Sequence, residues 1–419
     1  MAKQRILFLT IYSFNNLSDG YIFADLVTEF RDAGHDVTVL MPSEGTEQTL
    51  ILEKEGISQV KVASGAIQKT SSIQKIINLY KLDAAAKKIL KKNFTDKFDL
   101  VVCMISHCAF YKTVKFIKQR DGAFIYNMVK DIFPQNAVDM GMLSKGGLKG
   151  LLYKYFKHNE LNYYKISDAL GAISPAAVEF LKGDNPQIEH NRFEVNPNSV
   201  IAKDFSLIKD EIEAVREKHD IPQDKTIFVY GGNLGVPQGV EFLLEVLAKN
   251  ENRDDDAYFV IAGDGTQFDR IAEFFSANNP QKAKLIKRLS SSDFEELCLA
   301  SDVGLVFLNK AFTIPNYPSR VLSYMQARLP IVFAVDSACD AGRIAEANEY
   351  GFNCLSGETD KFFGFIDELL EDEDKHKKMG QNAYNYLCNN YTAKQSYDII
   401  IKHVKKPTEP QIHEEQTNV

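Results

Sequence analysis

Short apolar segments alternate with amphipathic ones from the beginning of the chain. Arg5–Thr10 (RILFLT) is a run of the kind found in parallel strands that are buried on both faces. After a polar loop, Ile22, Leu26 and Phe30 recur at helical spacing, and Val37–Leu40 is the next apolar run. The pattern predicts a β-α-β unit at this end of the chain.

The second half of the chain repeats this beginning. Thr226–Tyr230 is apolar, a glycine-rich loop follows, Val240–Ala248 has a helical pattern, and Tyr258–Ala262 is apolar again. Further strands are expected at Leu100–Met104, Phe124–Tyr126, Ala169–Ile173, Arg192–Val195, Lys284–Ile286, Val303–Phe307 and Ile331–Ala334. The sequence therefore predicts an α/β fold with two Rossmann-like domains, each a parallel sheet with helices on both faces.

The expected domain boundaries follow from these runs. Residues 1–200 should form the first domain and residues 201–390 the second, with a terminal helix at 391–405 that returns to the first domain. Residues 406–419 lack apolar periodicity and are expected to be a disordered tail. Because ligands of open α/β sheets bind beyond the carboxyl ends of the strands, we expect the site in a cleft between the domains.

Composition narrows the class of protein. Of 419 residues, 45% are apolar and 25% charged, which excludes disordered and fibrous classes. The net charge of −8 argues against a nucleic-acid partner, and it is unevenly distributed. Residues 1–200 hold 25 basic and 21 acidic side chains, whereas the remainder holds 24 and 36. No apolar run is long enough for a membrane span and no signal peptide is evident, so we expect a cytoplasmic protein.

The six cysteines are Cys103, Cys108, Cys298, Cys339, Cys354 and Cys388. They are scattered and form no Cys-x-x-Cys pair, which predicts reduced thiols rather than a zinc site or a disulfide framework.

The strongest local signal is the sequence YGGNLGVPQG, which starts at Tyr230 between a strand and a helix. Glycines let backbone approach a phosphate closely, and a following helix supplies N–H donors. The candidate ligand-binding residues here are Gly231, Gly232, Asn233, Leu234, Gly235 and Gln238, joined by Gly263 and Gly265 after the next strand. Both stretches are also compatible with ordinary tight turns, and neither a dinucleotide fingerprint nor a P-loop is present.

A third element is the loop FTIPNYPSR, in which Pro318 precedes Ser319 and Arg320. We expect Ser319 to cap a helix that begins near Arg320. An arginine in the first turn opposes the helix dipole, so its position makes better sense beside an anion such as a pyrophosphate. Lys310 is a weaker cationic candidate.

The order of these motifs, followed by PSRVLSYMQARLPIV, resembles the donor domain of glycosyltransferase family 4. The stretch VKDIFPQNAVDMG from Val129 is similar to members that assemble bacterial surface polysaccharides, such as capsule or O-antigen. The resemblance implies a GT-B fold and a retaining transfer without cofactor or metal. It also implies a nucleotide-sugar donor, with UDP as the family-level expectation, and a lipid-linked or oligosaccharide acceptor.

The chain departs from the family pattern at several positions. Many members carry a Glu-x₇-Glu pair that grips the sugar and ribose, and the matching positions here are Pro315 and Ser323. Basic residues that often flank the phosphate loop are replaced by Asn233 and Gln238. Arg320 is then the best remaining cation for the diphosphate. The resemblance therefore implies roles in donor binding for Ser319, Arg320 and Ser323, and in catalysis for Arg320.

Residues for the acceptor are expected in loops of the first domain. Asn16, His107 and Asp131 follow strands there, and Asp131 is the best candidate to act on the acceptor hydroxyl. His107 is equally compatible with a polar loop role. Asp254-Asp-Asp has metal-binding spacing but precedes a strand, so we expect a solvated turn and no metal site.

We expect an amphipathic helix in the first domain, between Asp131 and the strand at Ala169–Ile173. Leu148, Leu151, Leu152, Tyr155 and Phe156 share one helical face, and Lys145, Lys149, Lys154, Lys157 and His158 surround it. This pattern fits an interfacial helix on an anionic membrane surface, reinforced by a second basic segment at 87–92. The same periodicity also fits a helix that packs on the core. We expect a peripheral protein on the inner face of the plasma membrane.

Two other functions remain compatible with the sequence. A sugar-nucleotide epimerase shares the two-domain architecture but needs several acid and base groups around the sugar. A non-catalytic module that binds a nucleotide sugar is compatible with the missing glutamates. A dehydrogenase is least compatible, because a dinucleotide fingerprint is absent.

Overall fold

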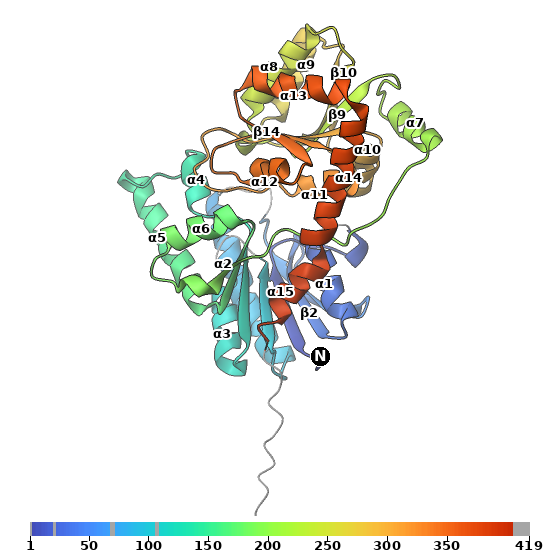
Figure 1. Ribbon diagram of the computed structural model, residues 1–419. Coiled ribbons are helices and arrows are strands. Elements are labelled where there is room, and N and C mark those ends of the chain that lie inside the picture. The colour runs from blue at the N-terminus through green and yellow to red at the C-terminus, as the bar shows by residue number, and fades with distance from the viewer. Residues whose placement is uncertain (1, 20–21, 68–71, 105–108, 405–419) are drawn as a thin grey trace, which may run out of the picture.

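A computed structural model of the protein describes residues 2–19, 22–67, 72–104 and 109–404. It shows two α/β lobes, one above the other (Figure 1). His107, Cys108 and the expected tail at 406–419 lie outside the described residues.

The first lobe is built on an eight-stranded sheet, as far as the structure describes the chain, in the order β3-β4-β2-β1-β5-β6-β7-β8. Its strands are β1 (Arg5–Thr10), β2 (Asp36–Glu44), β3 (Leu50–Lys54), β4 (Ile57–Ser64), β5 (Leu100–Met104), β6 (Phe124–Val129), β7 (Ala169–Ala172) and β8 (Phe193–Val195). Its helices are α1 (Ile22–Asp32), α2 (Ser72–Asn93), α3 (Tyr111–Asp121), α4 (Gln135–Asp139), α5 (Gly147–Ile166) and α6 (Pro175–Asp184). The central strands are fully buried, as their apolar runs require.

One edge of this sheet differs from the expected all-parallel arrangement. Strands β3 and β4 form an antiparallel hairpin, with Glu55 and Gly56 both at positive φ in the turn. Two residues at positive φ are typical of the tight hairpin turns that match strand twist. The prediction of a purely parallel first sheet was therefore wrong at this edge.

The second lobe has a six-stranded parallel sheet in the described part of the chain, in the order β11-β10-β9-β12-β13-β14. Its strands are β9 (Thr226–Asn233), β10 (Ala257–Asp264), β11 (Ala283–Lys287), β12 (Val303–Phe307), β13 (Ile331–Val335) and β14 (Gly351–Leu355). Its helices are α7 (Lys209–Lys218), α8 (Val240–Glu251), α9 (Phe268–Asn278), α10 (Ser291–Leu299), α11 (Arg320–Gln326), α12 (Ala341–Ala347), α13 (Thr359–Glu371) and α14 (Glu373–Asn390). The sequence patterns did not predict β14.

The last two helices join the lobes. Helix α14 runs down the side of the second lobe, and α15 (Ala393–Ile401) lies beside α1 of the first (Figure 1). Tyr397 of α15 is buried there, with its ring 4.7 Å from that of Phe30 and its hydroxyl 3.0 Å from His35 Nε2.

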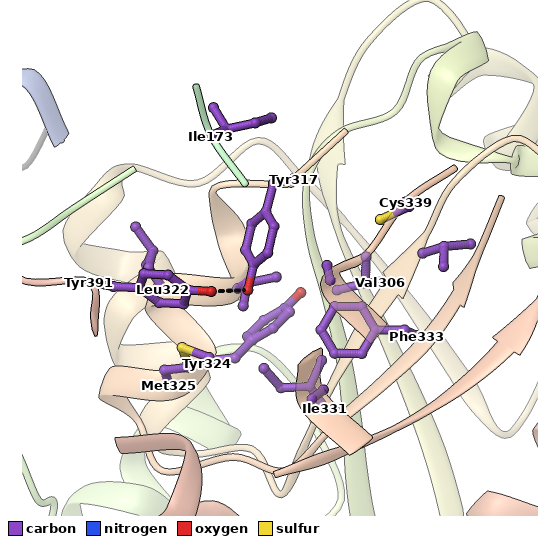
Figure 2. Packing of buried hydrophobic residues seen from close by; sticks show 14 of the residues in the cluster. Ile173, Val306, Tyr317, Leu322, Tyr324, Met325, Ile331, Phe333, Cys339 and Tyr391 are labelled. Carbon is purple, nitrogen blue, oxygen red and sulfur yellow. Dashed lines mark hydrogen bonds between the residues drawn. The ribbon is translucent and has the colours of Figure 1, made fainter. Parts of the chain in front are cut away.

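Apolar packing is continuous from one lobe to the other. One cluster contains Ile173, which follows β7, together with Tyr317, Tyr324 and Phe333 of the second lobe. Figure 2 shows Ile173 above Tyr317, whose hydroxyl is hydrogen-bonded at 2.8 Å to that of Tyr391. Protein interiors are packed about as densely as crystals of small organic molecules. This cluster therefore holds the two lobes in a fixed position relative to each other.

Candidate functional site

A cleft of about 710 Å³ lies between the two lobes. Its walls come from segments that follow β1, β6, β9 and β12, together with the start of α11. Hydrogen bonds cross between the lobes beside it. The Asp139 carboxylate accepts from the backbone N–H of Thr313 at 2.8 Å, and the Asp340 carboxylate accepts from that of Ala176 at 2.9 Å. The site thus lies at the carboxyl ends of strands, where open α/β sheets bind ligands.

Two glycines shape the wall formed by the end of β9. A Cβ at Gly231 would come within 1.9 Å of the Phe294 ring, so only glycine allows that ring to pack there. Gly232 has φ +120°, and a Cβ there would stand 3.6 Å from the guanidinium of Arg320. The absence of a side chain at Gly232 leaves the space beside that cation open.

Gly263 and Gly265 lie behind this wall rather than in the cleft. A Cβ at Gly263 would come within 2.1 Å of the Gly232 carbonyl oxygen, and one at Gly265 within 2.5 Å of that of Leu234. The two glycines therefore let the β10–α9 loop pack against the glycine-rich loop.

The expected cradle of backbone N–H donors is largely occupied by the protein itself. The N–H of Gly231 donates to the Tyr324 hydroxyl, that of Leu234 to the Asp264 carbonyl, and that of Gly235 to Gln238 Oε1. The Gln238 side chain folds back onto its own loop and also accepts from Asn233 Nδ2 at 3.0 Å. These three amides cannot also bind a phosphate in this arrangement, so that part of the prediction was wrong.

Arg320 forms no ion pair with the residues that the structure describes. Its guanidinium carbon lies 4.4 Å from the centre of the Tyr230 ring, a cation–π contact. Its Nη1 is buried and has no hydrogen-bond partner among the described residues. A buried charged donor without a partner is costly, so this geometry favours binding of an anionic ligand.

Helix α11 begins at Arg320, but Ser319 does not cap it. Ser319 has helical dihedral angles and makes no cap hydrogen bond, whereas capping requires an extended residue. The expected cap was wrong. Ser319 lines the cleft together with Ser323.

The structure brings most, but not all, of the candidate residues together. Those that line the cleft are Asp131, Gly231, Gly232, Asn233, Gln238, Ser319, Arg320 and Ser323. Leu234 is fully buried in the core of the second lobe. Lys310 is exposed outside the cleft lining, and Asn16 accepts a hydrogen bond from Lys54 Nζ at 2.6 Å, also outside it.

Sequence reasoning missed several ionisable residues of the cleft. Lys130 is half-buried, and desolvation lowers the pKa of its ammonium to about 7, while its Nζ donates to the Asn196 carbonyl at 2.9 Å. Burial raises the pKa of Asp25, which also accepts the backbone N–H of Ile201. Glu295 pairs with Lys203 at 3.7 Å. The sequence around these residues contains no motif that indicates a binding site, because only the packing of the lobes brings the residues together.

The acidic triplet before β10 forms ion pairs. Asp255 pairs with Arg253 at 2.5 Å and Asp256 with Lys225 at 2.5 Å. Among the residues that the structure describes, no group of three or more His, Cys, Asp or Glu side chains is arranged to hold a metal ion. Across the same residues, no helix is both long and apolar enough to cross a membrane.

The second half of the chain matches a known protein family. Residues 211–386 match the family "Glycosyl transferases group 1". A probable glycosyltransferase, WbjE of Pseudomonas aeruginosa, is 26% identical over 253 residues, which are 58% of this chain and 59% of WbjE. The matched stretch thus spans less than two thirds of that relative's length.

Solved structures match nearly the whole chain. Sucrose-phosphate synthase from Thermosynechococcus elongatus has a TM-score of 0.74 at 12% identity, covering 96% of this chain and 98% of that one. Anabaena HepE, solved in complex with UDP and glucose, has a TM-score of 0.69 at 16% identity, covering 95% and 98%. At such identity these structures show the fold, which is GT-B. The chain therefore has the GT-B fold, and its residues 211–386 are similar to the group 1 glycosyl transferases.

Proposed function

We propose that the protein transfers a sugar from a nucleotide-sugar donor, a UDP-sugar, to a lipid-linked saccharide, with retention of anomeric configuration. The family match of residues 211–386 supports glycosyl transfer, and HepE, of the same fold, has been solved with UDP. The similarity to WcaI of Escherichia coli, a putative colanic acid biosynthesis glycosyl transferase that is 24% identical over 151 residues, supports a place in bacterial polysaccharide synthesis.

The observation that supports the donor most strongly is the Arg320 guanidinium. It lies over Tyr230, beside the side-chain-free Gly232, with Nη1 buried and without a partner in the described part of the chain. A diphosphate would supply the missing anion through charge-assisted hydrogen bonds. Ser319 and Ser323 line the cleft with it and offer hydroxyl donors.

The chemistry asked of these residues is mainly electrostatic. The bond between the anomeric carbon and the diphosphate oxygen breaks, and a bond to the acceptor oxygen forms as its hydroxyl proton departs. Arg320 would stabilise the negative charge that develops on the leaving diphosphate. Asp131, across the cleft, would orient the acceptor hydroxyl. The contacts of Asp139 and Asp340 between the lobes would help exclude water from the activated sugar.

Product analysis separates this function from its alternatives. The protein should be incubated with UDP-sugars and a polyprenyl diphosphate-linked saccharide, and the lipid and nucleotide products identified. Transfer predicts an extended glycolipid together with free UDP. Recovery of an epimerised donor would instead identify an epimerase, and an unchanged donor that still binds would identify a non-catalytic module.

The Arg320→Ala variant tests the diphosphate contact. Loss of the cation should lower kcat/KM for transfer. The decrease should correspond to a loss of roughly 2–4 kcal/mol of transition-state stabilisation. It should also reduce the rise in Tm that UDP gives the wild type in the presence of a chelator. Lys310→Ala is the matched control, because Lys310 is exposed outside the cleft lining. Unchanged kcat/KM in a folded Arg320→Ala protein would remove Arg320 from the site.

We further propose that α5 places the acceptor side of the protein on an anionic membrane. Leu148 and Leu151 are 88% and 66% exposed, and Leu152 and Tyr155 are also exposed, which a core-packing helix would not show. Phe156 is the exception, since it packs against the Phe133 ring at 4.9 Å.

The basic side chains around this face differ in availability. Lys145, Lys149, Lys154 and His158 are exposed. Lys157 is instead held by Glu160 and Asp184. Its expected part in membrane binding was wrong, because its charge is already neutralised by these carboxylates.

Replacing Lys145, Lys149 and Lys154 with Glu should abolish sedimentation with anionic vesicles at low salt. Each basic residue near such a surface contributes about 1 kcal/mol, and salt screens the attraction. The control exchanges three exposed lysines of the second lobe, Lys209, Lys377 and Lys378, for Glu. Equal sedimentation with neutral and anionic vesicles, or equal loss in both variants, would contradict docking through α5.

A further inference from the structure

A second cavity, of about 390 Å³, lies in the first lobe between α2, the start of α3, α4 and α5. Much of its wall is apolar, formed by Ile76, Leu79, Phe110, Phe133, Leu143 and Phe156. We call this cavity the α2–α5 groove. Its volume falls within the range of about 300–1,000 Å³ that is usual for small-molecule sites.

The groove adjoins the cleft. Asn136 and Met140 line both spaces, so they lie between the two. The side-chain oxygen Oδ1 of Asn136 is buried without a hydrogen-bond partner among the described residues. Buried polar atoms are nearly always paired, so a donor such as a ligand hydroxyl is expected at this junction.

A lysine stands on the same path. Lys75 lines the groove, and Asp131 lines the cleft. Burial lowers the pKa of Lys75, while the negative charges of Asp131 and, more weakly, Glu44 act in the opposite direction, so Lys75 interacts electrostatically with both carboxylates. The groove's own carboxylate, Asp83, is occupied by the backbone N–H groups of Lys112 and Thr113 at 2.9 Å each. The cation of Lys75 is therefore positioned to bind an anionic group that enters from the cleft.

The elements that form the groove carry exposed apolar side chains. Seven of the sixteen large apolar side chains that are exposed in the described chain lie on α2, α5 or the segment before α5. They are Ile77, Tyr80, Met142, Leu148, Leu151, Leu152 and Tyr155. Tyr80, Met142 and Leu152 of this set also line the groove, so the groove adjoins the surface of α5 proposed above to face the membrane.

The apolar groove, the cation of Lys75 and the polar cleft follow one another in the order of a hydrocarbon chain, a phosphate and a sugar. We propose that the α2–α5 groove holds the apolar chain of a lipid-phosphate-linked acceptor, with its phosphate at Lys75 and its sugar in the cleft beside Asn136 and Asp131. This inference rests on the proposed function, because it places the acceptor of that reaction. An amphipathic peptide helix fits less well, since a helix about 10–12 Å across would not enter a groove of this volume.

The test uses farnesyl phosphate below its micelle-forming concentration, with titration calorimetry as the readout. Dimethylallyl phosphate is the short-chain probe with the same head group, and farnesol is the probe without phosphate. The wild type should bind farnesyl phosphate at least about tenfold more tightly than dimethylallyl phosphate, because the longer chain buries more apolar surface.

Two variants assign the contacts. Leu152→Asp, in the groove wall but 42% exposed, should weaken farnesyl phosphate at least about tenfold and leave dimethylallyl phosphate unchanged. Lys75→Gln should weaken both phosphates and leave farnesol unchanged. Ile208→Asp and Lys81→Gln, at exposed positions outside the groove, are the matched controls and should bind as the wild type does.

Equal binding of the two phosphates, or of farnesyl phosphate to wild type and Leu152→Asp, would overturn the proposal. UDP binding is measured on the same proteins as an independent readout. If farnesyl phosphate binds as expected but UDP does not, the groove stands and the donor assignment fails. If UDP binds and the lipid phosphate does not, the groove proposal alone fails.

Discussion

The cleft depends on an arginine whose charge the protein does not neutralise. Arg320 is held over the Tyr230 ring at 4.4 Å, and its Nη1 is buried without a partner in the described chain. A cation–π contact contributes about 0.5–2 kcal/mol. It therefore offsets only part of the free-energy cost of removing the guanidinium from water. Neighbouring features keep the position open. Gly232 adds no side chain, and the Tyr324 hydroxyl fixes Gly231 by accepting its N–H and donating to the Leu305 carbonyl. An anion completes this arrangement.

The two lobes divide the work that a transfer reaction requires. In the proposed reaction, the second lobe would supply the cation, the glycines and the hydroxyls that hold the donor, and the first would supply Asp131 and the adjoining groove. Apolar packing through Ile173 and Tyr317, and the crossing of α15 onto α1, hold the lobes in register. The polar cleft and the largely apolar groove therefore adjoin each other, and the exposed leucines of α5 lie on the groove side. That arrangement matches an acceptor with a sugar at one end and a hydrocarbon chain at the other.

The sequence predicted those parts of the structure that depend on local pattern. Leu100–Met104 and Val303–Phe307 are strands with the predicted bounds, because continuous apolar runs need burial on both faces. The sequence predicted Gln238 as a cleft residue, and it lines the cleft. The sequence did not predict that its side chain accepts the backbone N–H of Gly235 in its own loop, because that contact depends on the folded geometry of the loop. Ser319 likewise failed as a cap because its dihedral angles are helical. The face of α5 could not be assigned to core or surface by periodicity alone, and Lys75, Asn136 and Glu295 join their sites only through tertiary packing.

A crystal structure of the protein grown with UDP and a chelator tests the central claim most directly. The account predicts diphosphate oxygens within about 3 Å of Arg320 Nη1, beside Gly232, with no metal between them. Serine hydroxyls at Ser319 or Ser323 should share the same anion. A diphosphate bound elsewhere, with Nη1 still lacking a partner, would contradict the assignment of this cleft to a nucleotide-sugar donor.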